Sequence, residues 1–285
     1  MTTYAVTGAT GHLGRLVVDA LLSRGVPADD IVAIVRTPAK AADLADQGIV
    51  VREGDYSRPE TLPAALDGVT TLLLISGSEV GRRVPQHTAV VEAAKAAGVA
   101  RIAYTSVLRA DTTELVLAPE HKATEAVIRE SGIPFTILRN GPYIENYTSQ
   151  LDAYLQAGEI LGAAGDARVA GATRADFAAA AAAVLTGAAH DGAVYELGGT
   201  PFTLSQLAAA ITEVTGTTVV YRDVTGPEYV AAATASGLDD GTAGFLGALE
   251  AATARGDWYT DRDDLPRLLG HASTALADAI RAAKA

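Results

Sequence analysis

The stretch Thr3-Tyr-Ala-Val-Thr-Gly-Ala-Thr-Gly-His-Leu-Gly14 decides the fold of this chain. A short apolar strand runs into three glycines, and a helical spacing of apolar residues follows. Gly8 permits a tight turn, Gly11 lets the backbone approach a pyrophosphate, and Gly14 lets the helix pack close to the strand. The N-terminus of that helix faces the phosphate charge. The stretch therefore predicts a dinucleotide-binding turn, against the alternative of an ordinary glycine-rich loop.

The predicted cofactor contacts in this turn come from consecutive residues around the glycines. They are Gly8, Thr10, Gly11, His12, Leu13 and Gly14. The residues after the second predicted strand, 31–35, then identify the nucleotide. A site that prefers NAD usually has Asp or Glu at this strand end, to accept from the ribose 2′-hydroxyl. This chain has Arg36 there and Lys40 one turn later.

A guanidinium and an ammonium suit a 2′-phosphate and offer nothing to a bare ribose hydroxyl. Arg36 and Lys40 therefore predict NADPH as the cofactor. The alternative is that both are solvated surface cations after a strand.

Strands and helices alternate through the first half of the chain. Short apolar strands separated by amphipathic helices are typical of a parallel sheet covered on both faces. Strands are predicted at 31–35, 49–51, 71–75, 101–105, 135–138 and 194–197, with helices near 59–66, 85–97, 119–131 and 173–186. Together they predict an α/β chain with a Rossmann-type, doubly wound parallel sheet.

Beyond about residue 140 the alternation loosens. Residues 158–171 are glycine-rich and expected to be irregular, whereas the six alanines at 178–183 are expected to lie in a closely packed structural helix. The segments 204–215, 228–235, 238–257 and 274–283 read as mostly helical. We expect residues 1–150 to form the dinucleotide-binding domain, rejoined by parts of 168–198. Residues 151–285 would form a smaller, mostly helical C-terminal lobe that binds substrate and is interleaved with that domain.

Composition excludes several classes of function. The chain has 22 Lys and Arg against 34 Asp and Glu, a net charge of −12, which repels nucleic-acid phosphates. It has no cysteine, which excludes disulfides and thiol catalysis, and its five histidines show no metal-ligand spacing, so no metal is predicted. No signal peptide or membrane-spanning stretch is visible, and we expect a cytoplasmic protein.

Several segments together resemble one known family. They include Gly8-Ala-Thr-Gly-His-Leu-Gly14, Ile34-Val-Arg-Thr-Pro-Ala-Lys40, Leu74-Ile-Ser-Gly-Ser-Glu79, Tyr104-Thr-Ser106 and Leu138-Arg-Asn-Gly-Pro-Tyr143. They are similar to atypical short-chain dehydrogenases of the NmrA-like type, above all to the branch of bacterial NAD(P)H:quinone oxidoreductase 2 and triphenylmethane reductase. The resemblance covers nearly the whole chain. It implies a Rossmann domain with a small C-terminal lobe, NADPH as hydride donor, and quinones or similar flat electrophiles as acceptors.

One departure from ordinary short-chain dehydrogenases concerns their Tyr-x-x-x-Lys pair. In the register set by Glu125 and the segment 132–139, the Tyr position falls on Leu117 and the Lys position on His121. A mechanism through a tyrosinate base is therefore excluded. His121 could act as a weak general acid with a pKa near the working pH, or it could be a surface or cap-region histidine. Lys122 should point about 100° away from it.

Candidate substrate contacts follow the strand at 135–138. Tyr143 and Tyr147 come after its carboxyl end, where an open α/β sheet binds ligands. They are candidate walls for a flat acceptor, with Tyr143 also a candidate catalytic residue, or else they only pack the lobe. Ser106 stands roughly where the larger family has a serine and could hydrogen-bond a carbonyl, or could be a turn or cap residue.

The remaining cofactor candidates lie at other strand ends. Asp55 is placed to accept from the adenine amino group, or is a turn aspartate. Ser76, Gly77 and Ser78 are small residues that let the backbone lie along the adenosine and ribose. Thr105 ends a strand beside the nicotinamide half, and Asn140 could reach the carboxamide.

Two kinds of function remain open. The first is an enzyme that passes hydride directly to a quinone, whose product oxyanion is a stabilised phenolate that water can protonate. The second is an NmrA-like redox sensor that binds NADP(H) with little or no turnover. The expected partner is a small quinone-like molecule, and the protein is expected to be a monomer or homodimer.

Overall fold

The computed structural model describes residues 2–284. Its main sheet has seven strands in the order β3-β2-β1-β4-β5-β6-β8, all parallel. They are β1 (Tyr4–Thr7), β2 (Ile31–Val35), β3 (Val50–Glu53), β4 (Thr71–Leu74), β5 (Arg101–Val107), β6 (Phe135–Asn140) and β8 (Ala193–Leu197). The strand order reverses between β1 and β4, which places a ligand crevice outside their carboxyl ends. This topology confirms the predicted doubly wound α/β fold.

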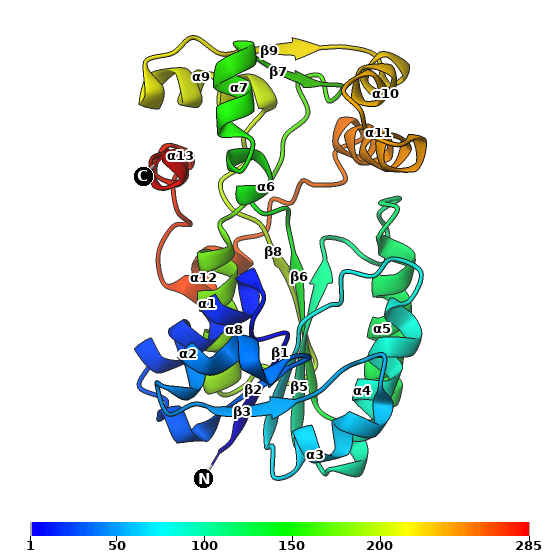
Figure 1. Ribbon diagram of the computed structural model, residues 1–285, viewed down its shortest axis with the longest axis vertical. Helices are drawn as coiled ribbons and strands as arrows, with labels where there is room; N and C mark the ends of the chain where they lie inside the picture. The colour runs from blue at the N-terminus through cyan, green and yellow to red at the C-terminus, as the bar shows by residue number, and fades with distance from the viewer. Residues whose placement is uncertain (1, 285) are drawn as a thin grey trace.

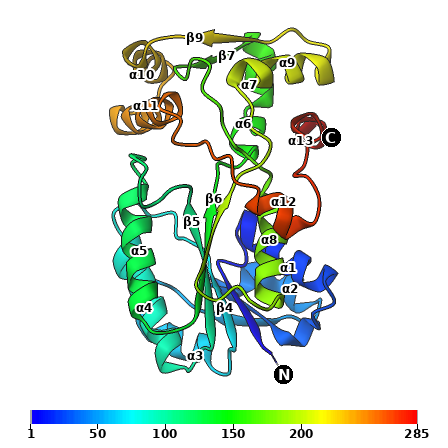
Figure 2. The ribbon, with the colours of Figure 1, turned by 180° about the vertical axis from the view of Figure 1, so that it is seen from behind.

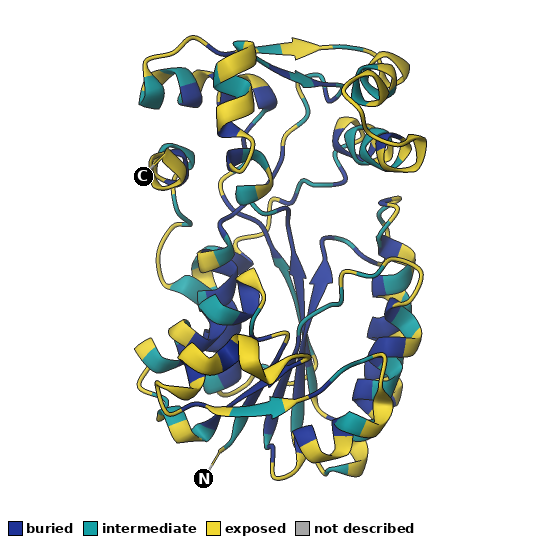
Figure 3. Ribbon diagram, viewed as in Figure 1, coloured by how far each residue is buried: buried dark blue, intermediate teal, exposed yellow. Residues whose placement is uncertain are grey.

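Helices cover both faces of this sheet (Figures 1 and 2). One layer contains α1 (His12–Ser23), α2 (Ala42–Ala45), α8 (Arg174–Thr186) and α12 (Asp264–Leu269), and the other contains α3 (Leu62–Leu66), α4 (Arg83–Ala96) and α5 (Ala118–Glu130). Short 3₁₀ turns occur at Ala28–Asp30, Pro38–Ala41 and Pro59–Thr61. Each face of the sheet has its own hydrophobic core. The main strands are therefore largely buried and the outer helix surfaces exposed (Figure 3).

The alanine-rich helix α8 packs where two elements need close approach. It lies against α1 and the sheet, and all but one of the alanines at 178–183 are buried. Its first turn is fixed by a capping box between Thr173 and Asp176. The prediction of a structural helix at this place is confirmed.

A smaller group of elements lies beyond the carboxyl ends of the strands (Figure 1). Its helices are α6 (Glu145–Thr148), α7 (Leu151–Ala157), α9 (Leu204–Thr215), α10 (Gly226–Ala235), α11 (Asp240–Ala254) and α13 (Leu276–Lys284). The lobe also has a two-stranded parallel sheet of β7 (Glu159–Gly162) and β9 (Val220–Asp223). The expectation that 158–171 is irregular throughout is wrong, because β7 lies within it. Four-residue strands with one exposed face carry too little apolar periodicity to be predicted.

The chain passes several times between the sheet and these outer elements. After β7 it returns to form α8 and β8, and after α11 it returns again to place α12 against α8 and β8. The last helix, α13, packs against α9 and α6. No helix within residues 2–284 is long and apolar enough to cross a membrane.

Candidate cofactor and substrate site

The turn between β1 and α1 has the backbone geometry of a phosphate cradle. Gly8 has a φ of +60°, a left-handed conformation that favours glycine. A Cβ on Gly11 would come within 3.1 Å of the Gly8 carbonyl oxygen, and a Cβ on Gly14 within 2.3 Å of the same atom. Among the described residues, no side chain caps the first N–H groups of α1. These N–H groups therefore remain available to an anion.

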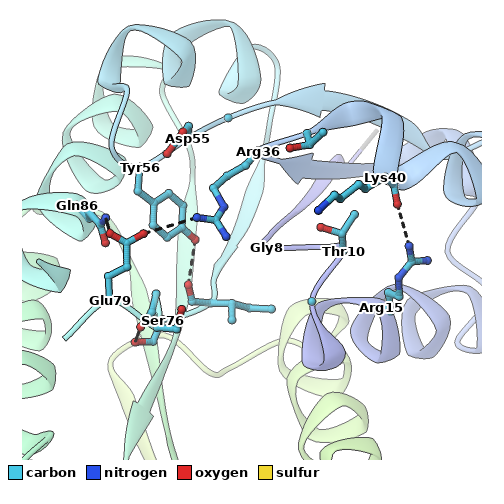
Figure 4. Close-up of a pocket in the computed structure, with 16 residues that line it drawn as sticks. Gly8, Thr10, Arg15, Arg36, Lys40, Asp55, Tyr56, Ser76, Glu79 and Gln86 are labelled. Atoms are coloured by element: carbon cyan, nitrogen blue, oxygen red, sulfur yellow. Dashed lines mark hydrogen bonds and ion pairs between the residues drawn. The ribbon is translucent and has the colours of Figure 1, made fainter. Parts of the chain in front are cut away.

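A cavity of about 610 Å³ opens beside this turn (Figure 4). Nine of the residues expected from the sequence line it, and they come from four strand ends. They are Gly8, Thr10, Gly11, Arg36, Lys40, Asp55, Ser76, Gly77 and Ser78. His12, Leu13 and Gly14 lie in the first turn of α1 but do not line it; Leu13 is buried and Gly14 serves close packing.

Arg36 and Lys40 give this cavity a cationic side. The Arg36 side chain is 71% exposed, and its NH1 lies 3.6 Å from Oε1 of Glu79. Figure 4 shows Glu79 reaching toward Arg36 from the loop after β4. The pair is solvent-accessible and therefore weak. A ligand phosphate can thus compete with Glu79 for the guanidinium.

Seven lining residues were not predicted as cofactor contacts: Arg15, Thr37, Gly54, Tyr56, Ile75, Glu79 and Gln86. Arg15 lies one turn after Gly11 on α1 and donates to the Lys40 carbonyl oxygen at 3.0 Å. Tyr56 directly follows Asp55, and its hydroxyl donates to the Ile75 carbonyl oxygen at 2.9 Å. Arg15 and Tyr56 could have been predicted, because each directly follows a predicted site residue in the sequence.

Asp55 has backbone and side-chain partners of its own. Its Oδ1 accepts from the Ser57 N–H at 2.9 Å, and its Oδ2 lies 3.4 Å from Nε of Arg58. The Asp55 side chain thus stabilises the turn after β3, and the residue also lines the cavity.

The loop after β4 is held by buried side chains of α4 and β5. The Gly77 N–H donates to Nε2 of His87 at 2.9 Å, and Nδ1 of His87 lies 3.0 Å from the Thr124 hydroxyl. Since Nε2 accepts, the His87 proton is on Nδ1. Burial lowers the pKa of His87 to about 4, and Arg83 adds to this effect. Thr105 contributes on the β5 side, where its hydroxyl oxygen accepts from the Ser76 N–H at 2.9 Å.

His121 lies at the start of α5, as one alternative expected, but it is buried and not a surface residue. The expectation of a pKa near the working pH is wrong, since burial lowers the pKa of His121 to about 3. Its Nδ1 lies 2.9 Å from the Tyr104 hydroxyl. The imidazole is therefore neutral at ordinary pH. Lys122 was expected to point away from His121 along the helix, and it is exposed.

Ser106 belongs to a buried ionic network rather than to an open cavity. Its hydroxyl donates to Oε1 of Glu125 at 2.7 Å. Arg139 binds both oxygens of the same carboxylate, at 2.9 and 2.8 Å, and reaches Glu196 at 2.8 Å. The expectation that this hydroxyl is free to bond a substrate carbonyl does not match this arrangement, because its proton is already donated.

Asn140 and Tyr143 lie at and just after the carboxyl end of β6. Asn140 is buried, and its Oδ1 has no hydrogen-bond partner within residues 2–284. The Tyr143 ring packs edge-on against Phe177, with centroids 5.6 Å apart, and lies under the Arg174 guanidinium at 4.5 Å. An unpaired buried acceptor is costly without a ligand partner. Asn140 therefore has the chemistry expected of a ligand contact.

A second cavity, of about 530 Å³, lies in the outer elements. Its walls are mainly apolar and aromatic, and Tyr147 is one of them, whereas Tyr143 is not. Tyr147 also packs edge-on against Phe202, with centroids 5.8 Å apart. In the described part of the chain, no group of three or more His, Asp or Glu residues could hold a metal ion.

The family model for NAD(P)H-binding proteins matches residues 8–188. The chain belongs to this NAD(P)H-binding family. Its span covers the glycine turn, both cations, the loop after β4 and Asn140. The family assignment agrees with the cavity, which the glycine turn, both cations and the loop after β4 line, whereas Asn140 lies outside that lining.

Relatives within the family are similar over the whole chain. Quinone oxidoreductase 2 of Escherichia coli strain K12 is 51% identical over 277 residues, 97% of this chain and 96% of that protein. A crystal structure of the NADPH-dependent quinone oxidoreductase from Escherichia coli, complexed with NADPH, matches with a TM-score of 0.96 at 50% identity, covering 99% of this chain and 100% of the other. Citrobacter sp. triphenylmethane reductase complexed with NADP(H) matches with a TM-score of 0.94 at 40% identity, covering 99% and 100%. The predicted family branch is confirmed.

Proposed function

We propose that this protein transfers a hydride from NADPH to a quinone or a similar flat electrophile, directly and without flavin or metal. The observation that carries the proposal is the presence of two cavities of different chemistry. One is lined by the glycine turn and two cations, and the other is apolar and aromatic. The 51% identity to a quinone oxidoreductase supports the same reaction class.

The residues of the first cavity fit NADPH. The N–H groups at the start of α1 and the close backbone approach at Gly11 suit the pyrophosphate. Arg36 and Lys40 suit the 2′-phosphate. Outside the lining of this cavity, at the carboxyl end of β6, the partnerless Oδ1 of Asn140 suits a carboxamide N–H. When bound, the cofactor supplies the hydride from its nicotinamide ring. The residues of the chain bind the cofactor and orient it.

The second cavity is the proposed acceptor site, and residues 151–285 supply most of its lining. Tyr147 forms part of its wall, whereas Tyr143 packs against the hydrophobic core of the main sheet. A flat ring bound there would be held in place, which favours transfer between two fixed partners. This assigns substrate binding to the C-terminal lobe and cofactor binding to residues 1–150.

The protein needs no strong acid for this reaction. A quinone is electron-poor, and its reduced oxygen is a stabilised phenolate that water can protonate. His121 remains neutral, because burial lowers its pKa to about 3. We therefore propose that His121 contributes to the reaction at most through a hydrogen bond, and that it does not transfer a proton as an imidazolium.

The redox-sensor alternative is less well supported. If the C-terminal lobe filled the acceptor site, the redox-sensor function would be favoured over the enzyme. The aromatic cavity of about 530 Å³ instead leaves room for a ring-shaped acceptor. We further propose a cytoplasmic protein, monomeric or homodimeric, whose net charge of −12 opposes nucleic-acid binding.

The direct test is NADPH oxidation with 1,4-naphthoquinone, beside NADH and a control without acceptor. We expect fast, acceptor-dependent oxidation that prefers NADPH. Tight NADPH binding with no turnover across several quinones and cationic dyes would instead support the sensor.

A further inference from the structure

Two carboxylates line the aromatic cavity of the lobe, and only one of them is neutralised. Glu159 is held by Arg222, whose Nε and NH2 lie 2.8 and 2.9 Å from its two oxygens. Glu250, on α11, has no cationic partner within residues 2–284. Its Oε2 accepts a hydrogen bond from the Ala163 N–H at 2.7 Å. That bond leaves the acceptor capacity of Oε1 unused.

Glu250 is half-buried and shares the cavity with the aromatic residues Tyr147, Tyr154, Tyr229 and Trp258. Burial raises the pKa of its carboxyl, and the charge of Asp223 raises it further. The charge of Glu250 in turn contributes to the raised pKa of the Tyr147, Tyr154 and Tyr229 hydroxyls, although burial is the larger cause for each. No hydrogen bond joins any of these hydroxyls to Glu250 in the described residues. Its Oε1 therefore has no protein donor among the described residues and remains available to water or a ligand.

We propose that this cavity selects flat aromatic rings that carry a hydroxyl or amino group, which donates a hydrogen bond to Glu250. The inference rests on the proposed function in taking this cavity as the acceptor site, and it predicts that rings with a donor group bind more tightly than rings without one, which are still accepted. Oε1 of Glu250 is not among the buried oxygens without a partner, so water can reach it. A ligand donor that replaces this water forms a charge-assisted hydrogen bond to the carboxylate. A ring with only methyl groups leaves the carboxylate unpaired. Rings that bear an acid group are repelled.

The cavity contains its own reporter. Trp258 is the only tryptophan of the chain, and it lines the same cavity. A ligand that enters the cavity should therefore change the tryptophan fluorescence. This readout needs neither NADPH nor turnover.

The experiment compares 4-methylphenol with 1,4-dimethylbenzene, which has a methyl group in place of the hydroxyl. The two rings are similar in size, and the hydrophobic effect alone favours the dimethyl compound. We expect the wild-type protein to bind 4-methylphenol at least about tenfold more tightly, by Trp258 fluorescence and calorimetry. Equal binding, or a preference for 1,4-dimethylbenzene, would overturn the proposal without any variant.

Two matched variants then test whether Glu250 causes the preference for 4-methylphenol. Glu250→Leu should abolish the preference for 4-methylphenol, whereas Glu159→Leu should retain it, because Glu159 is already paired with Arg222. Thermal unfolding checks that both variants fold. A preference that survives in a folded Glu250→Leu protein would overturn the role of Glu250.

NADPH oxidation with 1,4-naphthoquinone, measured on the same wild-type sample, separates this inference from the proposed function. Turnover without any preference for 4-methylphenol would reject the inference and leave the quinone reductase intact. A clear preference without turnover would retain the donor-selective cavity and reject the enzyme.

Discussion

At the scale of the residue, we propose that nucleotide choice depends on the guanidinium of Arg36. It lies at the end of β2, lines the cofactor cavity and is within 3.6 Å of the Glu79 carboxylate. A 2′-phosphate offers this cation more charge and more acceptor atoms than one carboxylate does. A ribose hydroxyl offers neither, so discrimination between the two nucleotides follows from this side chain.

Replacing Arg36 by Asp should weaken NADPH far more than NADH. We expect the Kd of NADPH to rise about 30- to 100-fold, the equivalent of about 2–3 kcal/mol, and that of NADH to change by less than about threefold. Calorimetric titration measures both. Arg82→Asp is the matched control, because Arg82 also lies near Glu79, at 3.7 Å, but does not line the cavity. Equal weakening of both nucleotides would reject the assignment to the 2′-phosphate.

Replacing His121 by Ala should slow quinone reduction only modestly. General acid catalysis contributes about 10²–10⁴-fold where it operates, but a histidine with a pKa of about 3 supplies no such proton near neutral pH. We expect the turnover rate to fall by less than about tenfold. A loss of several orders of magnitude, with circular dichroism unchanged, would show that acid catalysis by His121 matters.

Individual site residues differ in how far the sequence can predict them. Gly8, Arg36 and Lys40 were predictable because a local motif and a strand end fix their places. Glu79 was not, because its approach to Arg36 depends on how the loop after β4 folds over the cavity. The low pKa of His121 was missed for a similar reason, since its burial comes from packing that local sequence does not report.

At the scale of the element, the β1–α1 unit depends on close contact between helix and turn. A Cβ on Gly14 would lie 2.3 Å from the Gly8 carbonyl oxygen and 2.7 Å from Cα of Ala9. Neither backbone atom can move without opening the phosphate cradle. The position therefore couples fold stability to cofactor binding.

Gly14→Ala should lower the free energy of unfolding by about 1–3 kcal/mol and weaken NADPH binding as well. Gly244→Ala makes the same substitution in exposed helix α11, where a Cβ meets no atom within 4 Å. That control should gain about 0.5–1 kcal/mol. Urea unfolding compares them, and a Gly14→Ala protein as stable as the wild type would contradict the proposed packing.

The neighbouring helices α4 and α5 carry a pH response through His87 and His121. Their pKa values, about 4 and about 3, lie below the ordinary value of 6.5. The unfolded chain therefore binds more protons between pH 6.5 and these values, and the folded protein loses stability as the pH falls through this window. Each pKa unit corresponds to about 1.4 kcal/mol.

Urea unfolding at about pH 7 and about pH 5 measures this loss. The His121→Gln protein should lose less stability over the interval than the wild type, since it has one fewer imidazole to protonate. His271→Gln, at an exposed position, should behave as the wild type. Identical losses in all three proteins would contradict the role of His121.

Elements were predicted unevenly along the chain. The seven strands of the main sheet were predictable because each is a short apolar run that a helix follows or precedes in the chain. The β7–β9 pair was not, because its partners are separated by about sixty residues and stabilised in part by the Glu159–Arg222 ion pair. Such a contact leaves no local pattern.

At the scale of the whole molecule, the chain separates two tasks. The main sheet presents strand ends and a helix N-terminus to the cofactor, while the outer elements enclose an aromatic cavity. The repeated passage of the chain between these parts ties them together through α8, β8 and α12. Hydride transfer then requires that the cofactor and the acceptor be bound at the same time.

The measurement that tests direct hydride transfer most closely is an isotope effect. NADPH carrying deuterium on one or the other face of the nicotinamide C4 is mixed anaerobically with the protein and 1,4-naphthoquinone, without added flavin, in a single turnover. A fixed cofactor predicts a primary isotope effect for only one of the two labelled forms, with one hydroquinone formed per NADPH consumed. An equal effect from both forms, or no acceptor-dependent NADPH loss, would contradict a built hydride-transfer site.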